Sequence, residues 1–231
     1  MRILLKVILI VTAILIISHQ DAYAADLSPK ARASLQRLMK ESRSPLEVYW
    51  NDTMNTPSIL KGELSRPSKH TPEWIAYKYL NKTKALYGIQ FPNRDMKIIG
   101  VDRSHSGRIR VSLQHLLYRT PVWGDSMMIE IDDDGVIRQV QSRIHPYMEK
   151  KLFYRPMHAS VSFKKAAAIA EDVFQKREVA VEEMDIITYY LPTRPGTPLI
   201  YAVMVRNQDT GVETTLFIHA VTGRVIDPNP L

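Results

Sequence analysis

An unbroken alternation of polar and apolar residues over 108–114 constrains the fold of this chain more than any other feature. Successive side chains of a strand point to opposite faces, so this period predicts a strand with one buried and one solvated face, as in an antiparallel sheet. A second strand is predicted over 126–131. The pair Asp134-Gly135 then predicts a hairpin that leads into a return strand over 136–140.

Helices are predicted on both sides of these strands. Thr71 followed by Pro72 is typical of a helix start, and the apolar spacing that follows predicts a helix over 72–87. Ser162 is expected to cap another helix. The apolar stripe of that helix is Ala166, Ile169, Ala170 and Val173. A shorter amphipathic helix is expected within 26–40.

The second half of the chain repeats this order of elements. Strands are predicted over 199–205 and 214–221, with turns at 207–211 and 222–223, while the aperiodic stretch 147–157 is expected to be a linker. Because the strands follow one another through short turns, parallel units with crossover helices are disfavoured. We therefore expect an α+β fold with two modules, each a helix packed on an antiparallel sheet.

The N-terminus has the layout of a secretory signal peptide. Arg2 and Lys6 precede an apolar run over 7–17, and a polar stretch leads to an A-x-A cleavage site at 22–24. The run is shorter than the roughly 20 residues that a spanning helix needs, which disfavours a retained anchor. Residues 1–24 are therefore expected to be cleaved. The protein is expected to be secreted or extracytoplasmic, touching a membrane only through this segment before cleavage.

Net charge and cysteine content limit the functions that the chain could have. The formal net charge is +7, but the basic residues are scattered, so nucleic-acid binding is not expected. A basic surface suits an acidic partner, an anionic cell wall or a membrane surface. The absence of cysteine excludes disulfides and a thiolate nucleophile.

No catalytic or metal-binding motif is present in the sequence. The seven histidines form no H-E-x-x-H, no two of them are four residues apart, and there is no G-x-S-x-G or P-loop. Glu130, Asp132 and Asp134 before Gly135 faintly resemble a calcium loop, but Gln141 stands at the twelfth position, so a hairpin turn is favoured and surface calcium stays open. No catalytic residue, metal or cofactor is expected, and the chain is not expected to be an enzyme.

The segment 118–125 lies between two predicted strands and carries a large aromatic residue. Pro121 and Gly124 are expected to fix a turn there, because proline restricts φ and glycine permits unusual backbone angles. Trp123 is expected to fill the core beneath the helix. The alternative is an exposed anchor for a partner.

Residues 107–124 resemble the fungalysin/thermolysin propeptide (FTP) motif, in which a strand ends in a glutamine and a short turn precedes a Pro-Val-aromatic-Gly step. Segments 199–203 and 216–225 resemble a PepSY domain, although the family usually has aspartate where this chain has His219. The motif positions are Arg110, Gln114, Pro121, Val122, Trp123, Gly124, Gly135 and Gly223. The resemblance implies an FTP-like domain over 25–150 and a PepSY-like domain over 151–231, both cystatin-like.

In that family these modules precede a zinc protease domain, and the resemblance implies that they inhibit it and assist its folding. No zinc-binding helix follows here, so we expect a secreted, stand-alone propeptide-like protein that acts on a thermolysin-like metalloprotease in trans. The tail residues Asn229, Pro230 and Leu231 are expected to lie in the protease cleft like a product. The alternatives are a PepSY-type envelope sensor or cell-surface binding protein without a protease partner, and a truncated protease gene.

Overall fold

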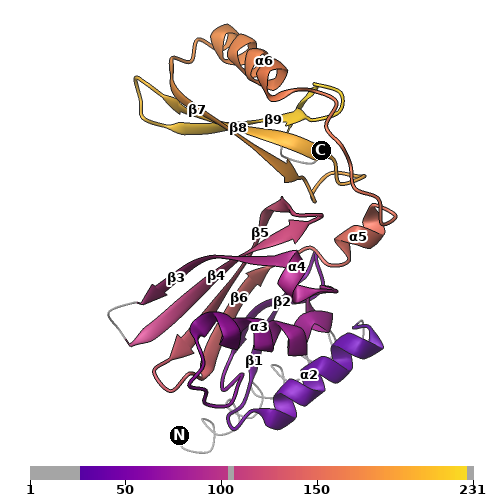
Figure 1. Cartoon of the computed structure of the whole chain (residues 1–231), viewed down its shortest axis with the longest axis vertical. Helices are drawn as coiled ribbons and strands as arrows, with labels where there is room; N and C mark the ends of the chain where they lie inside the picture. Colours follow the sequence, from indigo (N-terminus) through magenta and orange to yellow (C-terminus); the bar gives the residue numbers. More distant parts are fainter. Residues whose placement is uncertain (1–26, 104–106, 228–231) are drawn as a thin grey trace, which may run out of the picture. The chain divides into compact units, whose positions relative to one another are not determined.

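The computed structural model describes residues 27–103 and 107–227 and has an α+β fold with a mixed sheet and several helices (Figure 1). The chain divides into two compact units. Unit 1 holds the chain up to Gln114 together with Ser126–Pro146. Unit 2 holds His115–Asp125 together with the chain from Tyr147 onward. Strands β4 (Arg108–Leu117) and β5 (Thr120–Asp132) therefore each contribute residues to both units.

The sheet of unit 1 has its strands in the order β1-β2-β6-β5-β4-β3. Their bounds are Glu47–Asn51 for β1, Thr56–Lys61 for β2, Met96–Arg103 for β3, Arg108–Leu117 for β4, Thr120–Asp132 for β5 and Ile137–Arg143 for β6. The pairs β1–β2, β2–β6 and β5–β6 are antiparallel. The predicted strands at β4, β5 and β6 are thus confirmed, whereas β1, β2 and β3 were not predicted.

Helices α2 (Pro29–Glu41) and α3 (Pro72–Thr83) lie side by side in unit 1 (Figure 1). The hydroxyl of Thr71 accepts a hydrogen bond from the backbone N–H of Trp74, which confirms the predicted helix start. The 3-10 turn η1 (Lys84–Leu86) and the short α4 (Pro92–Asp95) follow α3. Apolar residues of α2, α3, β4 and β5 share one buried core, which includes Leu35, Leu38, Ala76, Leu80, Val111, Leu113, Ile129 and Ile131.

Unit 2 pairs the first residues of β5 with β7 (Val181–Tyr190), followed by β8 (Leu199–Asn207), β9 (Glu213–His219) and β10 (Val225–Ile226). The pairing of Val122 with Tyr190 is parallel and the other pairs of this unit are antiparallel, so the sheet is mixed rather than purely antiparallel as predicted. Strand β7 was not predicted.

Helix α6 (Phe163–Lys176) covers one face of this sheet (Figure 1). Ser162 caps it as predicted, by accepting a hydrogen bond from the backbone N–H of Lys165. Its buried residues are Ala166, Ala170 and Phe174, of which the phenylalanine was missing from the predicted stripe. The predicted linker contains the short helix α5 (Met148–Lys151), and Met148 and Leu152 are buried in the core of unit 2.

The turn between β4 and β5 lies at Tyr118 and Arg119, and not at Pro121 and Gly124 as predicted. Their φ angles are 51° and 69°, the left-handed pair that a two-residue hairpin turn requires. Pro121 and Gly124 lie inside β5. The prediction was wrong because proline and glycine are far commoner turn residues than tyrosine and arginine.

Candidate functional site

Arg110 helps to neutralise a buried carboxylate on the neighbouring strand. Its Nε lies 3.1 Å from Oε1 of Glu130, and the guanidinium of Arg108 lies 3.2 Å from Oε2 of the same residue. The Glu130 side chain is only 7% exposed, while both arginines are about half exposed. Since a buried carboxylate is costly unless it is paired, this cluster explains Arg110 as a structural residue.

Gly135 closes the hairpin between β5 and β6, as predicted. Its φ is +73°, and a Cβ at this position would lie 2.0 Å from the carbonyl oxygen of Ser68. Asp132 stabilises the turn, because Oδ1 accepts from the backbone N–H of Asp134 and Val136 and Oδ2 accepts from Nε of Arg138 at 2.6 Å. Two carboxylates of the faint calcium pattern therefore bind arginines. Across 27–103 and 107–227, no group of three or more metal-ligating side chains is found.

Gln114 is half-buried at the end of the FTP-like strand pattern, and the next residue forms a pair that sequence reasoning missed. Nδ1 of His115 lies 2.7 Å from Oδ2 of Asp125, and both side chains are buried. The signal available in the sequence was Asp125, which directly follows the Pro-Val-aromatic-Gly step. The pair connects the two strands of the β4–β5 hairpin.

Trp123 packs in unit 2, but not beneath the helix as predicted. Its ring contacts the rings of Tyr189 and Phe217 edge to face, with centroid distances of 5.0 and 4.9 Å. This small cluster also contains Ile200 and Ala202, which alternate along β8 with the residues that face α6. Trp123 therefore lies on the sheet face opposite α6.

The other two residues of the step differ in their surroundings. Val122 is fully buried and pairs with Tyr190 of β7, while Gly124 is exposed. The φ of Gly124 is +74°, and no atom lies within 4 Å of where a Cβ would stand. Glycine is thus favoured there by backbone conformation alone, whereas at Gly135 space is limiting as well.

His219, at the position where the family usually has aspartate, caps the turn that follows β9. Its Nδ1 accepts hydrogen bonds from the backbone N–H of Val221 at 3.1 Å and of Thr222 at 3.3 Å. A side-chain oxygen of aspartate makes the same bonds in an Asx turn. Gly223, with φ of +73°, completes the predicted turn by donating its N–H to the carbonyl of His219. The histidine side chain and Gly223 therefore both stabilise this turn.

The tail residues Asn229, Pro230 and Leu231 and the proposed signal peptide lie outside the described residues. The last described residue, Asp227, accepts a hydrogen bond on its carbonyl from Nε of Arg194 at 3.0 Å. In the part of the chain that the structure describes, no helix is long and apolar enough to cross a membrane.

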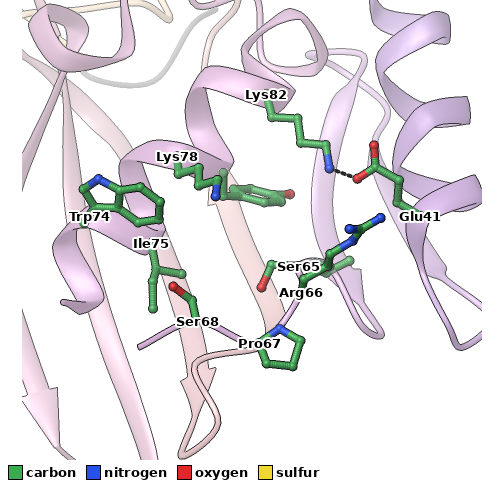
Figure 2. Close-up of a pocket in the computed structure, with 11 residues that line it drawn as sticks. Glu41, Ser65, Arg66, Pro67, Ser68, Trp74, Ile75, Lys78 and Lys82 are labelled. Carbon is green, nitrogen blue, oxygen red and sulfur yellow. Dashed lines mark hydrogen bonds and ion pairs between the residues drawn. The ribbon is translucent and has the colours of Figure 1, made fainter. Parts of the chain in front are cut away.

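A pocket in unit 1, which sequence reasoning did not find, lies between α3, the loop 64–68 and the end of α2 (Figure 2). Its volume is about 240 Å³. Trp74, Lys78 and Lys82 recur every four residues and therefore share one stripe of α3. Lys82 binds Glu41, and the ammonium group of Lys78 lies 4.5 Å from the centre of the Trp74 ring. In the sequence, the four-residue spacing of Trp74, Lys78 and Lys82 could have indicated that they share one face of the helix.

Comparison with known proteins finds a distant relative. No family model matches the chain. Among solved structures, the YpeB C-terminal domain of Bacillus megaterium aligns over 86% of this chain and 95% of that chain, with 10% sequence identity and a TM-score of 0.37. Bacillolysin of Bacillus cereus is 22% identical over 184 residues, which are 78% of this chain and 29% of bacillolysin. The chain is thus distantly related to bacillolysin and spans less than a third of that protein's length.

Proposed function

We propose that this chain acts as a propeptide-like protein on a thermolysin-like zinc metalloprotease, and that it binds the protease in trans to inhibit it, to assist its folding, or both. The observation that carries the proposal is the sequence relation to bacillolysin over 29% of that protein's length. We assign this share to the propeptide and not to the catalytic region.

The domain assignment belongs to the same proposal. Residues 25–150 would form the FTP-like domain and 151–231 the PepSY-like domain, both cystatin-like. The support is that each unit packs helices on a strand layer, α2 and α3 in unit 1 and α6 in unit 2. Residues 1–24 would be a signal peptide, so the protein would act outside the cytoplasm. It would have no catalytic activity of its own.

Binding to the protease is proposed to use the tail as well as the faces of the two units. Thermolysin-like enzymes accept large apolar side chains, as the resemblance implies, so Leu231 would enter the apolar pocket of the cleft. Asn229 and Pro230 would hold the tail extended, because proline restricts the preceding residue to extended backbone.

A direct experiment adds the purified chain, from residue 25 onward, to a thermolysin-like metalloprotease. We expect saturable inhibition of peptide hydrolysis, or a higher yield of active protease when the denatured enzyme is refolded with the chain. A version that lacks residues 229–231 should inhibit less at an unchanged melting temperature. Chelator-sensitive hydrolysis by the chain itself would show that it is an enzyme. If the chain neither inhibits peptide hydrolysis nor raises the yield of refolded protease, the proposal fails and the envelope-sensor alternative is favoured.

A further inference from the structure

Cationic side chains surround the pocket of Figure 2 and a broader hollow beside it, and the two share Glu41 and Arg66. We call this combined surface of unit 1 the basic groove. Its cationic residues are Arg37, Lys40, Arg43, Arg66, Lys78 and Lys82. Among the described residues that line it, Glu41 is the one carboxylate. Six positive charges therefore face one negative charge.

Most of this positive charge is not neutralised within the described chain. Lys82 pairs with Glu41, but over residues 27–103 and 107–227 no ion pair joins a carboxylate to the other five cations. These positive charges also affect the ionisation of Glu41. The pKa of Glu41 is lowered, first by the hydrogen bond from Lys82 and further by the charges of Lys82, Arg66 and Arg37.

The pocket also has an apolar floor. Leu64, Ile75 and Tyr79 are buried beneath it, and Trp74 at its rim is 41% exposed. The volume of about 240 Å³ exceeds the roughly 150 Å³ of an apolar cavity that accommodates benzene. One large apolar side chain of a ligand therefore fits in the pocket, with cations directly beside it.

We propose that the basic groove binds an acidic peptide segment of a protein partner, with one large apolar side chain in the pocket and flanking carboxylates on the surrounding cations. Arg66 and Lys78 stand on opposite sides of the pocket, on the loop and on α3 (Figure 2). Arg37, Lys40 and Arg43 extend the cationic surface along α2. The inference rests on the proposed function only in taking the partner to be a protein.

Two other anionic partners fit the groove less well. A membrane surface would reach the exposed cations but would leave the recessed floor at Leu64 and Tyr79 unfilled. A single-stranded nucleic acid would use an open aromatic face for base stacking. The ring of Trp74 already has His70 as a neighbour, with centroids 3.8 Å apart, as well as the Lys78 ammonium group.

The experiment measures binding of a short fluorescent peptide in which a phenylalanine is flanked by aspartates and glutamates, with no protease present. We expect saturable binding that weakens with salt. A second peptide with asparagines and glutamines in place of the acids should bind about tenfold more weakly, as should the variant Arg66→Glu/Lys78→Glu. Lys164→Glu/Lys165→Glu changes two exposed lysines of unit 2 and gives the same net charge, so it is the matched control. Thermal melting of every variant checks that it folds.

The outcomes separate this inference from the proposed function. Loss of peptide binding in the groove variant but not in the control supports the groove, whatever the protease assay shows. Equal losses in both variants, or no binding of the acidic peptide, overturn it. Binding of phosphatidylglycerol vesicles that depends on Arg66 and Lys78, without peptide binding, overturns it in favour of a membrane surface.

Discussion

Nδ1 of His115 lies 2.7 Å from Oδ2 of Asp125, and both side chains are buried in unit 2. Because an ionised carboxylate only accepts hydrogen bonds, the imidazole Nδ1–H donates in this pair. The bond joins β4 to β5 close to the Pro-Val-aromatic-Gly step. Breaking it would leave a buried polar group without its partner.

We expect Asp125→Ala to lower the free energy of unfolding of unit 2 by about 1–3 kcal/mol, the usual cost of leaving a buried donor unsatisfied. Asp125→Asn should cost less, because its amide oxygen still accepts a hydrogen bond. Urea denaturation followed by circular dichroism measures both. Equal and negligible effects of the two variants would contradict a structural role for the pair.

Trp123 should contribute to stability less than a fully buried tryptophan does. The ring is half-buried and its contacts are edge to face with Tyr189 and Phe217. We therefore expect Trp123→Ala to cost about 2 kcal/mol, below the 3–5 kcal/mol of a core tryptophan. Trp123→Phe should cost less than Trp123→Ala, because it retains an aromatic edge. Unchanged stability in Trp123→Ala, with loss of protease inhibition, would identify the residue as a partner anchor instead.

Short sequence patterns correctly predicted the helices and strands whose residues carry a clear local signal. Thr71 before Pro72 located the start of α3, and the alternation of 108–114 located β4. Strand β7 was missed because Glu182, Glu183 and Asp185 are poor strand formers. Their strand exists because it pairs with β8 along its length, and this pairing outweighs the low strand propensity of the acidic residues.

The candidate sites also differ in whether a local sequence pattern marks them. The turns at Gly135 and Gly223 were predicted, because glycine marks a backbone angle within a few residues. The basic groove was not predicted, since it forms where α2, the loop 64–68 and α3 meet in the folded unit. The scattered basic residues of the sequence gave no indication that six of them gather at one surface.

Gly135 and Gly124 offer a matched pair of substitutions. Both have φ near +74°, so alanine at either position adds backbone strain of about 1–2 kcal/mol. Only at Gly135 would the new Cβ also collide with the backbone of Ser68. We expect Gly135→Ala to lower the free energy of unfolding by about 1–3 kcal/mol more than Gly124→Ala does. Denaturant titration of the two variants measures this difference. Equal losses of stability at the two glycines would rule out the close approach of the Ser68 backbone.

Burial of two tyrosines in unit 1 predicts a loss of stability at alkaline pH. The hydroxyls of Tyr79 and Tyr87 lie 3.3 Å apart in the core. Burial raises the pKa of Tyr79 to about 12 and the pKa of Tyr87 well above its ordinary value. In the unfolded chain both ionise near pH 10. Above that pH the unfolded state therefore binds fewer protons than the folded state, so the free energy of unfolding must fall as pH rises.

For Tyr79 this stabilising contribution is fully present below about pH 10 and is lost as the pH rises to about 12, at about 1.4 kcal/mol per pH unit. Tyr79→Phe removes the ionisable group, so its stability relative to the unchanged protein should improve between about pH 8 and pH 11. Tyr154→Phe, at an exposed tyrosine of unit 2, is the matched control. Urea titrations at the two pH values provide the comparison. If the difference in free energy of unfolding between Tyr79→Phe and the unchanged protein is the same at both pH values, the Tyr79 hydroxyl does not titrate from a buried site.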